Sequence, residues 1–381
     1  MMNPLVKSCC LLVGSALLNL ACSSEPAQQI PELPDFDEAT YYEYALTSLD
    51  EVLAEDPDNA EALYQRAELL LKQGETNRAL SSIRKAIDVD GNHPAYRLVS
   101  GRALLQKGQN REAAREAKAA LDRSGPSLDI YELLAEASLN SNYFADALGY
   151  SDSALTLAPH SHQNYLRKGM AAARVQDTLL AEQSLLKSLE LGAEETAVYG
   201  TLVDMWMNND RYRKARVYME KMLATGQMNN QVRFQQAKIL RMTGMEDSAQ
   251  AILYRLRADS TINHTPVYQE LTALYYQKRH YDSALHYAQR TMQRLPEEKE
   301  IMLMAARIYD RRYRYQQAIR QYEAIVSMDS MQQQDIHQIA EQELYNLKRK
   351  VTYLWRKKQE EEFEKLKRMT PIQSISPNTT D

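Results

Sequence analysis

The residues best suited to chemistry are few and lie far apart. The three cysteines are Cys9, Cys10 and Cys22, all close to the N-terminus. His160 and His162 lie close together after a proline, but no cysteine or acidic residue stands at ligand spacing from them. No phosphate-binding loop, zinc-protease motif or nucleophile-elbow motif occurs. We therefore expect no catalytic constellation, no metal site and no cofactor, and a hydrolase is the least favoured class.

Cys22 is the cysteine with the most informative surroundings. Lys7 supplies a positive charge near the N-terminus, Cys9–Leu20 is an apolar run, and the small residue Ala21 directly precedes Cys22. This arrangement resembles a bacterial lipoprotein signal, although Asn19 stands where that family prefers leucine. The resemblance implies cleavage before Cys22 and lipidation of its thiol and amine, which gives durable anchoring. An ordinary secretory signal is the alternative.

The signal sets expectations for the N-terminal segments and for location. Residues 1–21 are predicted to be removed, taking Cys9 and Cys10 with them. Residues 22–35 carry Pro26, Pro31 and Pro34, typical of an extended tether. By resemblance to sorting in Gram-negative bacteria, the absence of aspartate after Cys22 favours a lipid-anchored protein of the cell envelope, in the outer membrane facing the periplasm.

The elements behind these residues follow one pattern, seen first in residues 60–93. Two apolar runs with helical spacing flank Gly74, a residue type that favours the left-handed end of a helix. An alanine of the second run recurs at intervals of 34 residues, with one interval of 35. These alanines are Ala45, Ala79, Ala113, Ala147, Ala181, Ala215, Ala249, Ala284 and Ala318. Their register predicts stacked helical hairpins, each too small to bury its apolar faces alone.

The period, the small residues and the turn glycines resemble the tetratricopeptide repeat (TPR) family. The resemblance implies an all-α solenoid of helix-turn-helix units wound into a right-handed superhelix. We expect a half unit or N-terminal capping helix over residues 36–59 and eight units over residues 60–330. Their first helices should begin near Ala60, Pro94, Leu128, His162, Thr196, Asn230, Thr265 and Lys299. Residues 331–369 should form a C-terminal capping helix with a charged extension, and residues 370–381 a flexible tail.

In this family the first helices line a concave groove that binds peptides. Mapping the family's groove positions gives an acidic early part and a basic late part. The candidates are Tyr64, Glu68, Glu132, Glu136, Phe234, Lys238, Arg241, Tyr276, Arg307 and Arg311. We hypothesise that the groove holds a peptide of complementary charge; the alternative is that these are merely solvated faces. Reversing Lys238, Arg241 and Arg307 together is then expected to abolish partner capture.

These features predict a non-enzymatic scaffold or adaptor for unknown protein partners, with membrane attachment through the lipid. An envelope glycan- or nutrient-binding protein is the alternative. It needs exposed aromatic platforms, whereas Trp206 and Trp355 both fall at expected packing positions. The net charge of −5 disfavours a nucleic-acid partner, because such proteins usually present a strongly basic face.

Overall fold

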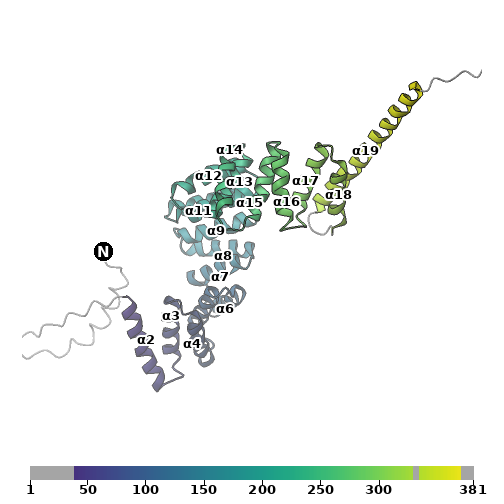
Figure 1. Cartoon of the computed structure of the whole chain (residues 1–381). Helices are drawn as coiled ribbons and strands as arrows, with labels where there is room; N and C mark the ends of the chain where they lie inside the picture. Colours follow the sequence, from purple (N-terminus) through teal and green to yellow (C-terminus); the bar gives the residue numbers. More distant parts are fainter. Residues whose placement is uncertain (1–37, 329–333, 370–381) are drawn as a thin grey trace, which may run out of the picture. The chain divides into compact units, whose positions relative to one another are not determined.

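The computed structural model describes residues 38–328 and 334–369, and within these ranges the chain is helical and contains no strand (Figure 1). The predicted signal, Cys22, the tether and the C-terminal tail lie outside the described residues. The helices are α2 Glu38–Glu55, α3 Ala60–Lys72, α4 Thr76–Val89, α5 Pro94–Gln106, α6 Asn110–Ser124, α7 Leu128–Asn140, α8 Phe144–Leu157, α9 His162–Arg174, α10 Thr178–Glu190, α11 Glu195–Asn208, α12 Tyr212–Ala224, α13 Asn230–Met242, α14 Glu246–Ala258, α15 Thr265–Gln277, α16 Tyr281–Met292, α17 Lys299–Arg311, α18 Tyr315–Ser327 and α19 Gln334–Met369.

Helices α3 to α18 pair into hairpins, each made of a first and a second helix, as the all-α repeat prediction requires. The chain divides into two compact units between Asn92 and His93. In the first unit, α2 packs on α3 and α3 packs on α4. In the second unit, helices α5 to α19 contact neighbours one or two places along the chain. The only first helix that departs from the expected starts is α11, which begins at Glu195, one residue before Thr196.

The recurring alanines explain why the hairpins close tightly. From Ala79 to Ala318, all eight are at most 1% exposed. Opposite them on the first helices lie small or compact residues, including Gly101 and Gly169. A β-carbon added at Gly169 would lie 2.6 Å from Leu185 Cγ and 3.1 Å from the Leu185 nitrogen. The helix crossing at this position therefore leaves no room for a methyl group.

The turn inside each hairpin uses one residue with a left-handed backbone. In all eight hairpins φ at this residue lies between 55° and 82°. Only three of the eight are glycine, although a side chain makes this conformation less favourable. The residues are Gly74, Gly108, Asn142, Gln176, Asp210, Gly244, Arg279 and Tyr313.

Helix α19 closes the second unit and then continues beyond it. Its buried residues Ala340, Leu344 and Leu347 pack in one cluster with residues of α17 and α18. Beyond this cluster the helix projects as a single rod (Figure 1). Trp355 lies on this projection and is 62% exposed, so its predicted packing position is wrong: the apolar stripe of α19 continues past the last helix that could cover it.

Candidate functional site

The first helices of the second unit form one face. Adjacent pairs α5–α7, α7–α9, α9–α11, α13–α15 and α15–α17 contact each other, and α17 contacts α19. We call the surface of α5, α7, α9, α11, α13, α15 and α17 the first-helix face. Repetition with a fixed period brings residues about 30 positions apart in the sequence into contact across it.

Polar links join neighbouring first helices across this face. Glu132 accepts a hydrogen bond from the Asn164 amide at 2.9 Å, and Glu136 pairs with Arg167 at 2.8 Å. The Gln235 amide donates to the Asp204 carboxylate at 2.6 Å. The predicted acidic residues Glu132 and Glu136 are therefore already engaged within the protein.

The predicted basic residues of α13 differ from one another. Arg241 Nε lies 2.7 Å from Glu270 Oε2, and their side chains are only 10% and 12% exposed. Lys238 is partly exposed and has no ion-pair partner in the described part of the chain. Phe234 is partly buried and packs against the core around α15 and α16. Reversing the charge of Arg241 would therefore break an internal ion pair before it tested partner binding.

Three predicted residues gather in one pocket between α15, α17, α18 and α19. We call it the C-terminal pocket, and its volume is about 460 Å³. It brings together the predicted residues Tyr276, Arg307 and Arg311. Its lining residues are Tyr276, Arg307, Asp310, Arg311, Tyr322, Glu343, Asn346, Leu347 and Lys350.

Two cations of the C-terminal pocket are neutralised by the protein itself. Arg307 donates to both carboxylate oxygens of Glu343 at 2.6–3.0 Å, and Lys350 donates to Asp310 at 2.8 Å. Burial would raise the pKa of Glu343, but hydrogen bonds from Arg307 and Tyr322 outweigh it and lower the pKa. Burial and the bond to Glu343 raise the pKa of the Tyr322 phenol. This network joins α19 to α17 and α18.

Arg311 is different, because no carboxylate lies within ion-pair distance of it among the described residues. It is exposed and donates a hydrogen bond to the Tyr281 hydroxyl at 2.9 Å. Its guanidinium also lies 5.5 Å from the ring centroid of Tyr276. The two tyrosines thus position a cation that keeps its charge available for a ligand.

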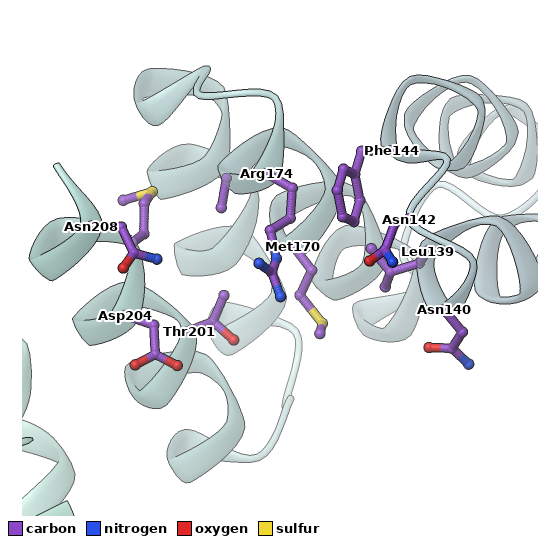
Figure 2. A pocket seen from close by; sticks show the side chains of 11 residues that line it. Leu139, Asn140, Asn142, Phe144, Met170, Arg174, Thr201, Asp204 and Asn208 are labelled. Carbon is purple, nitrogen blue, oxygen red and sulfur yellow. The ribbon is translucent and has the colours of Figure 1, made fainter. Parts of the chain in front are cut away.

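A second pocket on the first-helix face lies between α7, α8, α9 and α11, with a volume of about 380 Å³. We call it the Arg174 pocket. Figure 2 shows Arg174 with Phe144 on one side and Thr201 and Asp204 on the other. The lining residues are Leu139, Asn140, Asn142, Phe144, Met170, Ala173, Arg174, Thr201, Asp204, Met205 and Asn208.

Arg174 has no ion pair or side-chain hydrogen bond among the described residues, and its guanidinium lies 5.5 Å from the Phe144 ring centroid. Desolvation raises the pKa of the Asp204 carboxyl, against the opposing effects of the Gln235 hydrogen bond and the Arg174 charge. The sequence prediction missed this pocket. The signal was present, because Met170 and Arg174 occupy the ninth and thirteenth places of the unit that begins at His162.

The remaining predicted residues, Tyr64 and Glu68, lie partly exposed on α3 of the first unit. Over the described residues, no group of three or more histidine, cysteine or acidic side chains is placed to hold a metal ion. No helix of the described ranges combines the length and apolar character needed to cross a membrane.

The tetratricopeptide repeat models match residues 36–102 and, separately, residues 98–162 and 272–330. With the helical hairpins and their period, these matches show that the chain contains tetratricopeptide repeats. No curated protein sequence matches the chain.

Solved repeat proteins that are similar to parts of this chain share little sequence identity with it. PilW, described as a widely conserved type IV pilus biogenesis factor, is 21% identical, with a TM-score of 0.48 over 54% of this chain and 94% of PilW. PilF of Pseudomonas aeruginosa is 18% identical, with a TM-score of 0.46 over 59% and 99% of the two chains. A tetratricopeptide repeat protein of Parabacteroides merdae is 14% identical, with a TM-score of 0.46 over 74% and 98%.

Proposed function

We propose that this protein is a non-enzymatic scaffold that holds a protein partner on its first-helix face. Tetratricopeptide repeats support protein–protein interaction, because stacked repeats present extended surfaces built from exposed helix positions. The observation that carries the proposal is the unbalanced cation Arg311 in the C-terminal pocket, held between Tyr276 and Tyr281. An aromatic-flanked arginine is typical of binding hot spots.

The same face suggests how a partner is recognised. Among the described residues, Arg174 and Arg311 each lack a carboxylate within ion-pair distance, while Arg241 and Arg307 are neutralised internally. A partner segment with acidic residues would be attracted to the two unbalanced arginines. Lys238, on α13, adds a further positive charge to this face.

The binding test uses the full-length chain as bait in solubilised cell envelopes. Arg311→Gln removes the unbalanced charge, whereas Arg320→Gln removes an exposed charge from α18 outside the pocket. We expect the first variant to lose a stoichiometric partner at least tenfold and the second to retain it. Equal recovery with both variants would contradict the assignment of the C-terminal pocket.

The location is the finer part of the proposal. We place the protein in a bacterial cell envelope, anchored by lipid on Cys22. Support comes from the apolar run that ends in Ala21 directly before Cys22. Labelling cells with a radioactive fatty acid should mark the wild-type protein and leave Cys22→Ala unlabelled. Labelling of both proteins, or of neither, would argue against the anchor.

A further inference from the structure

A third pocket lies at the turn between α11 and α12 and shares no lining residue with the two pockets above. We call it the turn pocket, and its volume is about 670 Å³. Residues from the start of α10 and the end of α13 complete it. The lining residues are Thr178, Trp206, Asp210, Arg211, Tyr212, Arg213, Lys214 and Met242.

The lining of the turn pocket carries more positive than negative charge. Arg211 and Arg213 are exposed, and neither forms an ion pair or a side-chain hydrogen bond with any described residue. Lys214 Nζ lies 3.9 Å from the Trp206 ring centroid and 3.4 Å from Glu182. Asp210, the only acidic residue among the described residues that line the pocket, accepts a hydrogen bond from the Tyr212 hydroxyl at 3.2 Å. The pocket therefore presents a surplus of positive charge.

The backbone adds to this surplus. Helix α12 begins at Tyr212, and no side chain of the described ranges caps its first turn. The first amide groups of a helix have no partner within the helix, and the helix dipole favours negative charge at this end. These amide groups belong to residues that line the pocket. An uncapped start recurs in all the other second helices except α10, where the Asp177 side chain accepts a hydrogen bond from the Leu180 N–H. It therefore supports an anion site only together with the side chains.

Trp206 supplies an independent observation. Its side chain forms part of the pocket wall, the residue is only 6% exposed, and its buried indole Nε1 has no hydrogen-bond partner among the described residues. An indole N–H can only donate, and buried donors nearly always have an acceptor. Because this nitrogen has almost no accessible surface, an acceptor from a ligand would reach it only after a small shift of the side chains around it.

We propose that the turn pocket binds an organic oxyanion, meaning a phosphate or carboxylate group attached to an apolar or aromatic body. The arginine side chains, the start of α12 and the Trp206 N–H are all donors, and oxyanion oxygens only accept. The pocket is larger than a phosphate ion needs. The Trp206 ring and Met242 offer an apolar wall for the rest of the ligand.

The experiment uses NMR spectroscopy to follow the two indole N–H signals of the full-length chain labelled with ¹⁵N-tryptophan. Trp355→Phe assigns them, because the protein has two tryptophans. We expect phenyl phosphate to shift the Trp206 signal saturably, with a dissociation constant on the order of 1 mM or lower, which corresponds to about −4 kcal/mol. The exposed Trp355 should stay unchanged. Phenylacetate in place of phenyl phosphate distinguishes a carboxylate ligand from a phosphate ligand, and a saturable Trp206 shift with either supports the proposal.

A matched pair of variants tests which charges bind. Arg211→Gln with Arg213→Gln should weaken phenyl phosphate binding at least tenfold. Arg216→Gln with Lys221→Gln removes two charges of the same helix outside the pocket and should leave binding unchanged. The proposal is overturned if neither compound gives a saturable Trp206 shift. A shift equal to that produced by sodium chloride at the same ionic strength, or equal weakening in both variant pairs, would also overturn it.

Discussion

The ion pair between Arg241 and Glu270 should be a structural support of the first-helix face and not a binding contact. Its nitrogen–oxygen distance of 2.7 Å corresponds to a Coulomb attraction of about 6 kcal/mol at an effective dielectric constant of about 20. Desolvation of both groups cancels much of this attraction. Removing one partner leaves the other charge nearly buried, which typically costs 3–5 kcal/mol. The side chains keep 10% and 12% exposure, so we expect a loss of about 3 kcal/mol in Arg241→Met.

Hydrogen exchange of the α13 and α15 amides is the assay, because local stability in a repeat array need not equal global stability. A loss of about 3 kcal/mol should accelerate exchange by about a hundredfold. The double variant Arg241→Met with Glu270→Leu should recover most of the protection, because it leaves no unpaired charge. Arg255→Met, which removes an exposed charge on α14, is the control. Exchange in Arg241→Met as slow as in the wild type would refute the reasoning. Additive losses of protection in the double variant would also refute it.

Three further predictions concern the turns, the helix crossings and pH. Arg279→Gly should raise the free energy of unfolding of its hairpin by about 0.5–1 kcal/mol, measured by urea denaturation, because φ is 58° there; a loss would show that the side chain stabilises the turn. Gly169→Ala should lower the melting temperature, because the added carbon would clash with Leu185. Gly149→Ala should raise the free energy of unfolding by about 0.5–1 kcal/mol, because no described atom beyond its chain neighbours and the backbone of its own helix lies within 4 Å of the added carbon. Equal effects of the two substitutions on stability would contradict this packing. The lowered pKa of Glu343 means that its contribution to stability is present above its unfolded-state pKa of about 4.3 and is lost as the pH falls through its folded-state pKa. Limited proteolysis of α19 should therefore become faster at acid pH, and Glu343→Gln should remove most of this pH dependence. An unchanged pH dependence in Glu343→Gln would show that other carboxylates control it.

Much of the fold could be predicted, because the repeat requires a small residue at the same position of each unit. A buried helix crossing tolerates only a small side chain, and the buried alanines from Ala79 to Ala318 mark these crossings in the sequence. The left-handed turns were less visible. Glycine marks three of them, but Arg279 and Tyr313 adopt the same backbone because the surrounding hairpin imposes it.

The candidate site was harder to predict, because charge in the sequence does not reveal pairing. Arg241 and Arg311 look alike as basic residues at groove positions, yet one is neutralised by Glu270, 29 positions away, and the other is not. Trp355 was misassigned because helical periodicity predicts which side of α19 is apolar but not where its packing partner ends.

The local pattern of contacts limits how far the structural effect of a binding event extends along the helices. Each helix of the second unit contacts helices one or two places away, so stiffening spreads only to neighbours. The Arg174 pocket ends at α11 and the C-terminal pocket starts at α15. Occupancy of one should barely alter the affinity of the other. A partner with two matching segments would instead benefit from tethering, since its second attachment occurs at a high effective concentration set by the length of its own linker. A partner with two segments would thus bind more tightly through avidity, although occupancy of one pocket does not change the affinity of the other.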